Sequence, residues 1–318
     1  MADFDVFNGD ADGICALVQL RLAEPRDATL VTGVKRDVAL LDRVDANDGD
    51  RVTVLDVSMR NNRRALDGAL AAGATVLYVD HHNPGEIPTH PSLTTIIDTD
   101  AALCTSLLVD RHLNSVHHLW AITAAFGDSL AAVARDLSIE AALSADATAQ
   151  LERLGTLINY NGYGETVADL HFAPDALYLN LVRHRSPFEF IADGAIYAEL
   201  NEGYEADMAL AEAAKVADRS AAGDILLLPD EAGSRRVSGV YGNAISQAAP
   251  ERAHAVLTER DGGYRVSVRA PVARRSGADD LCLQFATGGG RAGAAGINDL
   301  PEADLDRFIG AFRETFTP

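Results

Sequence analysis

The sequence predicts an α/β protein in which an N-terminal parallel-sheet domain flanked by helices leads, through a connector helix, into a smaller C-terminal α+β domain. Three successive patterns along the 318 residues support this prediction. Over roughly the first 100 residues, short apolar runs alternate with helical patterns, which is typical of βαβ units. From 102 to about 220 the pattern is mainly helical, and short strand-like runs return after Gly223.

Five strands and two helices are expected in the first region. The strands are DFDVF (3–7), ATLVTGV (28–34), RVTVLD (51–56), ATVLYV (74–79) and TTIID (94–98). Helical patterns at 13–23 and 61–72 fit between strands, and Asp12 is expected to cap the first of these helices. The alternation of the two kinds of element predicts a parallel sheet.

The rest of the chain sets the domain boundaries. Amphipathic patterns in LWAITAAFGDSLAAVARDL (119–137) and ELNEGYEADMALAEAAKVADR (199–219) predict helices, of which the latter is interpreted as a connector. The later strands are expected at ILLLPD (225–230), RVSGVYG (236–242), HAVLTERD (254–261) and YRVSVRAP (264–271), before a final helix near 302–315. We therefore expect domains at 1–195 and 223–318, joined by a connector helix at 196–222.

The composition limits the kinds of partner. The formal net charge is −20, and only Lys35 and Lys215 among the 27 basic residues are lysines. Long-range attraction to a phosphate polymer, including a long nucleic-acid duplex, is therefore not expected. A partner that carries phosphate has to be small, or has to be bound by a local arginine cluster or by metal ions.

Neither a signal peptide nor a membrane helix is expected from the sequence. Its start, MADFDVFNGD, is too acidic for a signal peptide, and no apolar run approaches the roughly 18 residues that a membrane helix needs. A soluble cytoplasmic protein is the expectation. Cys15, Cys104 and Cys282 form no CxxC pair, which favours buried reduced thiols over a disulfide framework or a thiolate zinc site.

Acidic and histidine side chains follow three of the expected strands. They are Asp10 and Asp12 after the first strand, Asp56 after RVTVL, and Asp80, His81 and His82 after ATVLYV. Because the carboxyl ends of parallel strands share one edge of a sheet, these loops should converge on one composite site. Taken singly, each cluster is explained by turns, loops and helix caps, but three of them at equivalent strand ends favour function.

This set of side chains predicts metal binding. Several carboxylates crowded together cannot all ionise without a cation, and carboxylates with imidazoles but no thiolate suit Mn²⁺, Mg²⁺ or Co²⁺. Two ions roughly 3.5 to 4 Å apart, bridged by a carboxylate and a water, would stabilise the attacking and leaving oxygens at phosphorus. Phosphoester hydrolysis is the reaction that this chemistry favours. His117 and His118 lie in a helical pattern without acidic neighbours in sequence and are interpreted as helix surface.

Four motifs resemble those of the DHH phosphoesterase superfamily. They are NGDADG (8–13), VLDVS (54–58), VDHHNP (79–84) and AAFGDS (124–129), and together they are specific. This superfamily includes RecJ-like exonucleases, nanoRNases with pAp phosphatase activity, cyclic-dinucleotide phosphodiesterases and manganese-dependent pyrophosphatases. The resemblance extends over most of the chain and implies two domains, a catalytic DHH domain and a C-terminal substrate-binding domain.

The resemblance also implies roles for individual residues. The implied metal ligands are Asp10, Asp12, Asp56, His81 and Asp128, with Asp56 bridging two ions, Mn²⁺ being the best candidate and Mg²⁺ or Co²⁺ the alternatives. Asp80 would orient an imidazole, His82 would contact the scissile phosphate, and Asn8 would contact substrate. One departure is that Val6 and Asn8 stand where members often place a further His or Asp ligand, which implies a weaker second metal site.

The stretch GGGRAGAAG (288–296) contains GxGxxG, but only 22 residues follow Gly296, too few for the βαβ unit of a dinucleotide-binding loop. It resembles instead the GGGHxxAAG signature of the DHH-associated C-terminal domain. The implied substrate contacts are the backbone of Gly288, Gly289 and Gly290, together with Arg291 in place of the signature His and Arg269 in VSVRAP. An arginine binds phosphate bidentately.

LINYNGYG (157–164) allows two interpretations: a loop that stacks a base on Tyr160 or Tyr163, or the end of a helix, which we favour.

The expected function is a metal-dependent phosphoesterase acting on short oligonucleotides or small nucleotides. The alternatives are a catalytically weak nucleotide-binding or regulatory protein and a pyrophosphatase. A homodimer is compatible with the resemblance.

Overall fold

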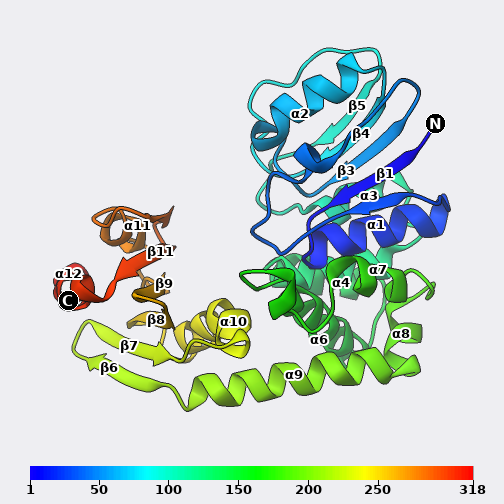
Figure 1. Ribbon diagram of the computed structural model, residues 1–318. Coiled ribbons are helices and arrows are strands. Elements are labelled where there is room, and N and C mark those ends of the chain that lie inside the picture. The colour runs from blue at the N-terminus through cyan, green and yellow to red at the C-terminus, as the bar shows by residue number, and fades with distance from the viewer. Residues whose placement is uncertain (318) are drawn as a thin grey trace. The chain divides into compact units, whose positions relative to one another are not determined.

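Two separate sheets organise the chain. The computed structural model describes residues 1–317 and divides into a first unit, Met1–Glu202, and a second unit, Gly203–Pro318 (Figure 1). The first unit contains an all-parallel sheet and the second a mixed sheet, so the expected α/β class is confirmed.

The sheet of the first unit has the five expected strands. They are β1 (Asp3–Phe7), β2 (Thr29–Val31), β3 (Arg51–Leu55), β4 (Thr75–Asp80) and β5 (Leu93–Ile97), in the order β2-β1-β3-β4-β5. The direction of the strand order reverses between β1 and β3, and the carboxyl ends at such a point form a natural ligand site. Phe7 pairs with Leu55, which pairs with Val79. The segments that follow β1, β3 and β4 therefore leave the sheet at the same level.

Side chains of this sheet alternate between two buried faces. Val6, Val54 and Tyr78 belong to the core beneath α2 (Met59–Ala71) and the 3₁₀ turn η1 (Leu40–Arg43). Neighbouring residues of the same strands point to the opposite face, where Figure 1 shows α1 (Ala11–Ala23) and α3 (Thr105–His112). The two faces explain why the strands are apolar almost throughout.

A helical layer completes the first unit. It comprises α4 (His118–Gly127), α5 (Ala131–Glu140), α6 (Ala145–Asn161), η2 (Val167–Asp169), α7 (Pro174–Leu181) and α8 (Pro187–Asp193). The amphipathic stretch 119–137 forms parts of two helices, α4 and α5, because the chain turns at Asp128 and Ser129 adopts a positive φ of 66°. A Cβ on Gly127 would lie 2.4 Å from the Cβ of Ala11, so glycine is what lets α4 approach the start of α1.

The connector helix is shorter than expected. Helix α9 (Ala195–Glu212) spans the boundary between the units, and β6 (Lys215–Arg219) follows it within the range expected as helix. The chain leaves the helix because residues 215–219 pair with the next strand, β7 (Gly223–Leu228), in antiparallel fashion. Strand pairing overrides the helical pattern of this segment.

The second unit has a six-stranded sheet in the order β10-β11-β9-β8-β7-β6. Its remaining strands are β8 (Ala253–Arg260), β9 (Gly263–Arg269), β10 (Gly288–Arg291) and β11 (Ala294–Pro301). Its helices are α10 (Ala232–Ala248), α11 (Ala278–Cys282), η3 (Glu302–Asp304) and α12 (Leu305–Phe316), so the expected final helix is present.

The prediction of a strand at RVSGVYG was wrong, because these residues lie within α10. Val237, Tyr241 and Ile245 recur every four residues and pack on Leu226, Leu228 and Val256 of the sheet. This spacing places them on one face of a helix. The opposite face of the sheet carries the aromatic residues of α12, Phe308, Phe312 and Phe316.

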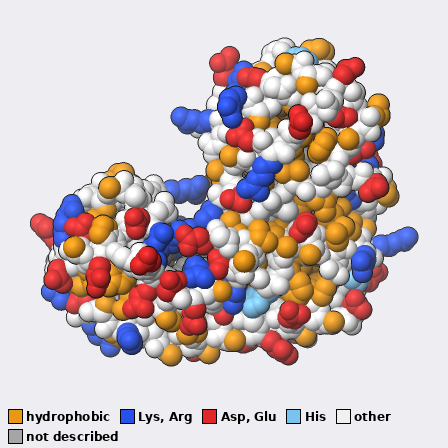
Figure 2. Space-filling view, in the orientation of Figure 1, with side chains coloured by type: hydrophobic (Ala, Val, Ile, Leu, Met, Phe, Trp, Pro, Cys, Tyr) orange, Lys and Arg blue, Asp and Glu red, His pale blue; other side chains and the backbone are white. Residues whose placement is uncertain are grey.

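Two further expectations concern the chain as a whole. Cys15, Cys104 and Cys282 are free and buried, as expected. Among residues 1–317 no helix is long and apolar enough to cross a membrane. On the face shown in Figure 2, Lys and Arg side chains are interspersed with Asp and Glu and form no continuous basic track.

Candidate metal centre

Asp10 caps helix α1 at the carboxyl end of β1. Its Oδ1 accepts hydrogen bonds from the backbone N–H groups of Asp12 (3.0 Å) and Gly13 (3.1 Å). The prediction that Asp12 is the cap was wrong, because the helix begins at Ala11 and a cap residue must precede the first helical residue. A Cβ on Gly13 would lie 2.3 Å from the carbonyl oxygen of Asn8, so glycine is required where the loop closes on the helix.

The side chain of Asp12 does not cap α1 and is bound instead by the backbone at the start of α3. Its two carboxylate oxygens accept the backbone N–H groups of Thr105 and Ser106, each at 2.7 Å, at the start of α3. The carboxylate is fully buried and lies against a helix N-terminus, where a negative charge is favoured. Thr105 and Ser106 were not among the predicted site residues, and they act here through the backbone N–H groups of a helix N-terminus.

Asp56 occupies an unusual backbone conformation directly after β3. Its φ of 59° lies in the left-handed region, and its N–H donates to the carbonyl of Val79 (3.1 Å). Burial and the nearby carboxylates of Asp12 and Asp10 raise the pKa of Asp56 well above its usual range. Strained residues that the surrounding structure holds in place are concentrated at functional sites.

Asp128 enters the same cluster from the end of α4. Burial and the negative charges of Asp12 and Asp10 raise its pKa to about 7. Its Oδ2 lies 3.8 Å from Nε2 of His81. The close approach of α4 to α1 at Gly127 is what brings Asp128 beside loops that are more than a hundred residues earlier in the chain.

His81 has the geometry of a metal ligand. Its Nδ1 lies 2.9 Å from the carbonyl oxygen of Leu103, and because a carbonyl can only accept, Nδ1 carries the proton. In the neutral ring, the lone pair of Nε2 then faces carboxylate oxygens of Asp56 (3.5 Å), Asp128 (3.8 Å) and Asp12 (3.9 Å). A metal ion bound by Nε2 would lie among these carboxylate oxygens and balance their charge.

His82 points its ring to a different partner. Its Nδ1 lies 2.8 Å from Oδ1 of Asp80, a carboxylate that is completely buried. The hydrogen bond to Asp80 raises the pKa of His82 and so favours the imidazolium. The side chain of His82 is 44% exposed, which leaves its other nitrogen accessible. Asp80 thus orients His82, whereas a backbone carbonyl orients His81.

Lys35 is the charged residue at this site that the sequence analysis did not assign. It follows β2, the fourth strand to contribute at this edge, and its Nζ donates to Oδ2 of Asp10 (2.5 Å) and Oδ1 of Asn159 (2.9 Å). Burial would lower the pKa of Lys35, but Asp10, Tyr163 and Asp128 outweigh it and raise the pKa well above its usual value. The feature of the sequence that could have pointed to Lys35 is its rarity, since it is one of only two lysines.

Asn8 is held by hydrogen bonds at both ends of its amide, and the substrate contact expected of it stays a prediction. Its side chain is buried, its amide N–H donates to the carbonyl of Lys35 (3.0 Å), and its oxygen accepts the N–H of Asp10 (3.2 Å). These bonds tie the Asp10 loop to the segment that carries Lys35.

The donor atoms of this cluster fit a divalent ion. Within residues 1–317, two sets bring their ligand atoms within 4.8 Å of one another, and these are Asp12, His81 and Asp128, and Asp56, His81 and His82. All are oxygen or imidazole nitrogen, which suits Mn²⁺ or Mg²⁺ better than a structural zinc site. A cation here would also offset the repulsion that raises the pKa values of Asp56 and Asp128.

The comparisons with known proteins decide the fold. No family model matches the sequence, and no curated protein does. Among solved structures, the DHH domain of a protein described as a member of a family of ribosomal proteins superimposes with a TM-score of 0.66 at 13% identity, covering 99% of this chain and 86% of that one. The chain has the DHH superfamily fold.

Two further structures of the DHH group superimpose along nearly the whole chain. RecJ from Thermus thermophilus in complex with Mn²⁺ has a TM-score of 0.62 at 19% identity, covering 98% of this chain and 51% of that one, so the chain spans about half its length. A pGpG-specific phosphodiesterase from Vibrio cholerae has a TM-score of 0.57 at 19% identity and 99% coverage of both chains.

The second unit of the DHH fold aligns two arginines on one sheet face. Arg291 of β10 pairs with Ala294 of β11, and Ala294 pairs with Arg269 of β9. Residues paired in this way project from the same face, and adjacent strands are about 4.8 Å apart, so the arginines flank a small residue roughly 10 Å across. Arg269 is oriented by Asn243, whose Oδ1 accepts from its Nε at 2.7 Å, and Arg291 is exposed.

The structure explains why glycine is needed at two of the three positions before Arg291. They lie in strand β10 at the edge of the sheet. A Cβ on Gly288 would lie 1.7 Å from the carbonyl oxygen of Cys282, and Gly290 has a φ of 145°, so both are explained by local packing. A Cβ on Gly289 would meet nothing within 4 Å, and its partner Gly296 is also small. Gly289 is thus the glycine of the three that local packing does not require.

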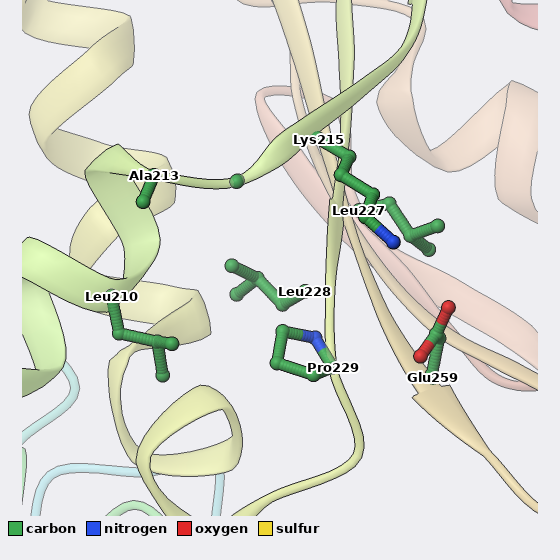
Figure 3. A pocket seen from close by; sticks show the side chains of 8 residues that line it. Leu210, Ala213, Lys215, Leu227, Leu228, Pro229 and Glu259 are labelled. Carbon is green, nitrogen blue, oxygen red and sulfur yellow. The ribbon is translucent and has the colours of Figure 1, made fainter.

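A cavity of the second unit lies apart from the expected substrate residues, whereas the segment LINYNGYG supplies Asn159, whose Oδ1 accepts from Lys35. A cavity of about 220 Å³ in the second unit has mainly apolar walls, and Figure 3 shows Lys215 and Glu259 as its charged members. None of the expected substrate residues lines it. LINYNGYG contains the end of α6, as favoured, and base stacking on Tyr160 is wrong because that ring is buried and its hydroxyl lies 2.9 Å from His171.

Proposed function

We propose that the protein is a metal-dependent phosphoesterase that hydrolyses phosphodiester or phosphomonoester bonds of short oligonucleotides or small nucleotides. The observation that carries the proposal is the position of Nε2 of His81, which faces three carboxylates while Nδ1 is bound to a carbonyl. RecJ with bound Mn²⁺ and the pGpG-specific phosphodiesterase, which share the fold, support it.

The first unit would supply the reacting groups. A bound Mn²⁺ ion supplies Lewis-acid stabilisation of charge on phosphate oxygens. Asp12, Asp56, His81 and Asp128 would hold the ion, Asp12 being fixed by α3 and His81 by Leu103. The imidazolium of His82, held by Asp80, would donate a hydrogen bond to the scissile phosphate. The resemblance implies a second ion, for which Asp10 and Asp56 would be ligands.

The substrate is proposed to be small because of the charge of the chain. At a net charge of −20, the protein has no long-range attraction for a long nucleic-acid strand. Phosphate has to be recognised locally, by the metal centre, by His82, and by arginines such as Arg269 and Arg291.

A panel of substrates in the presence of Mn²⁺ tests the proposal. We expect release of nucleotide or phosphate from dinucleotides, short oligonucleotides and mononucleotide bisphosphates, with long single strands and pyrophosphate turned over more slowly. Chromatographic separation of the products measures this. Faster turnover of pyrophosphate would establish the pyrophosphatase alternative, and binding without turnover of any substrate would establish the regulatory one.

Arg291→Ala is expected to weaken the binding of a phosphate-terminated substrate by roughly 10- to 150-fold, because one charge-assisted hydrogen bond contributes about 1.5 to 3 kcal/mol. The same substrate without its terminal phosphate should lose much less. Kinetics on both substrates measure the difference, and Mn²⁺ binding should not change.

Arg307→Ala is a matched control for this variant, because Arg307 is a half-exposed arginine on α12, whose aromatic residues pack on the opposite face of the same sheet. It should leave both substrates unaffected. Equal losses on the two substrates in Arg291→Ala would show that Arg291 does not bind that phosphate.

A further inference from the structure

The ammonium group of Lys35 lies inside the acidic cluster, in the manner of a bound cation. Its Nζ contacts Oδ2 of Asp10 at 2.5 Å and Oδ1 of Asn159 at 2.9 Å, and it lies 3.9 Å from Oδ1 of Asp128. The backbone of Lys35 is fixed on both sides, because its N–H donates to Gly162 (2.8 Å) and its carbonyl accepts from Asn8 (3.0 Å). The position of Lys35 is therefore fixed by hydrogen bonds of its backbone as well as of its side chain.

The oxygens of the cluster divide between two partners, His81 and Lys35. Asp128 directs Oδ2 towards His81 and Oδ1 towards Lys35. Asp10 belongs to neither of the two donor sets found within residues 1–317, and its carboxylate is instead used by α1 through Oδ1 and by Lys35 through Oδ2. The donors around His81 can bind an ion, whereas Asp10 is already paired with the ammonium group of Lys35.

We infer that Lys35 takes the place of a second metal ion, so that the protein binds one divalent ion per chain and the ammonium provides the second positive charge at the reacting phosphate. This inference rests on the proposed function for its substrate, and it replaces the second ion that the resemblance implies. Lys35 lies outside the four motifs that resemble those of the DHH superfamily.

The geometry also leaves Lys35 able to reach a ligand. The hydrogen bonds to Asp10 and Asn159 use two of its three N–H groups, and its side chain is 27% exposed. The third N–H can donate to an anionic oxygen of a phosphate. A fixed ammonium, unlike a second ion, cannot be removed by chelation.

The number of Mn²⁺ ions bound per chain tests the inference without any assay of turnover. Calorimetric titration of the metal-free protein should give one ion per chain. Lys35→Met removes the charge, keeps an unbranched side chain and frees Asp10 and Asn159, so its stoichiometry should rise to two. Lys35→Arg keeps the charge and should remain at one. Lys215→Met, which changes the only other lysine, should also remain at one.

Inorganic phosphate is a second probe. With only one equivalent of Mn²⁺ per chain, Lys35→Met should bind phosphate about 10- to 150-fold more weakly than the unchanged protein, and Lys215→Met should bind it normally. Thermal unfolding of each metal-free variant confirms that it is folded before the titration is interpreted.

The outcomes separate this inference from the proposed function. No Mn²⁺ bound to the unchanged protein would contradict the proposed function itself. Two ions bound to the unchanged protein would leave the function in place and overturn the role of Lys35, and this result needs no variant. One ion in Lys35→Met, or phosphate binding unchanged by that substitution, would also overturn it.

Discussion

Asp56→Asn should lower kcat by more than about a hundredfold and leave the fold intact. Substitutions of residues that merely support metal ligands typically reduce activity about 10- to 100-fold, so loss of a central ligand should exceed that range. Asp56 is central because Nε2 of His81 lies 3.5 Å from its Oδ1 and because burial and the charges of Asp12, Asp10 and Asp128 raise its pKa. Steady-state kinetics with saturating Mn²⁺ measure the effect.

Asparagine is the informative replacement at this position. It tolerates the left-handed backbone of residue 56, and its amide oxygen can still accept the hydroxyl of Thr105, which lies 3.2 Å away. Because the substitution removes a charge from a crowded acidic cluster, the metal-free variant should unfold at the same or a higher temperature. Asp98→Asn, at an exposed aspartate directly after β5, should leave kcat within about twofold. Near-native turnover of Asp56→Asn would show that the metal ligands are wrongly assigned.

Exhaustive removal of divalent ions should abolish hydrolysis, to below about 1% of the starting rate, and Mn²⁺ should restore it more fully than Mg²⁺ or Co²⁺. The physical reason is the donor set, in which carboxylates and imidazole without thiolate surround a site that carries too much negative charge for a phosphate to approach. Rates after dialysis against a chelator, and after return of each ion, measure this requirement.

Thermal stability provides an independent measurement in the same experiment. An ion that binds only the folded protein raises the free energy of unfolding by about 2.7 kcal/mol at a hundred times its Kd. The temperature of unfolding should therefore fall on chelation and recover with Mn²⁺, even for a variant that is inactive for another reason. Full activity in the chelated protein would contradict a metal-dependent reaction.

Most of the first sheet is predictable from local pattern. Strands β1, β3, β4 and β5 are short apolar segments between helical patterns, and their order along the chain places Asp10, Asp56 and Asp80 at strand ends. The second unit is less predictable, because RVSGVYG has the residues of a strand but the spacing of one face of a helix, and residues 215–219 have a helical pattern but pair as a strand. Short segments of this kind depend on the partners against which they pack.

The carboxylates and histidines of the site, and their convergence at one edge of a parallel sheet, follow from the sequence because strand periodicity and motif spacing are local properties. The assignment of each side chain does not. Asp10 rather than Asp12 caps α1, Asp80 orients His82 and not His81, Asn8 supports a loop, and Lys35 joins the acidic cluster through Asp10 and Asn159. These contacts join residues up to 124 positions apart, as Lys35 and Asn159 are. They form only when α4 and α6 pack on α1 and the strands of the sheet end at the same level, which no local pattern in the chain records.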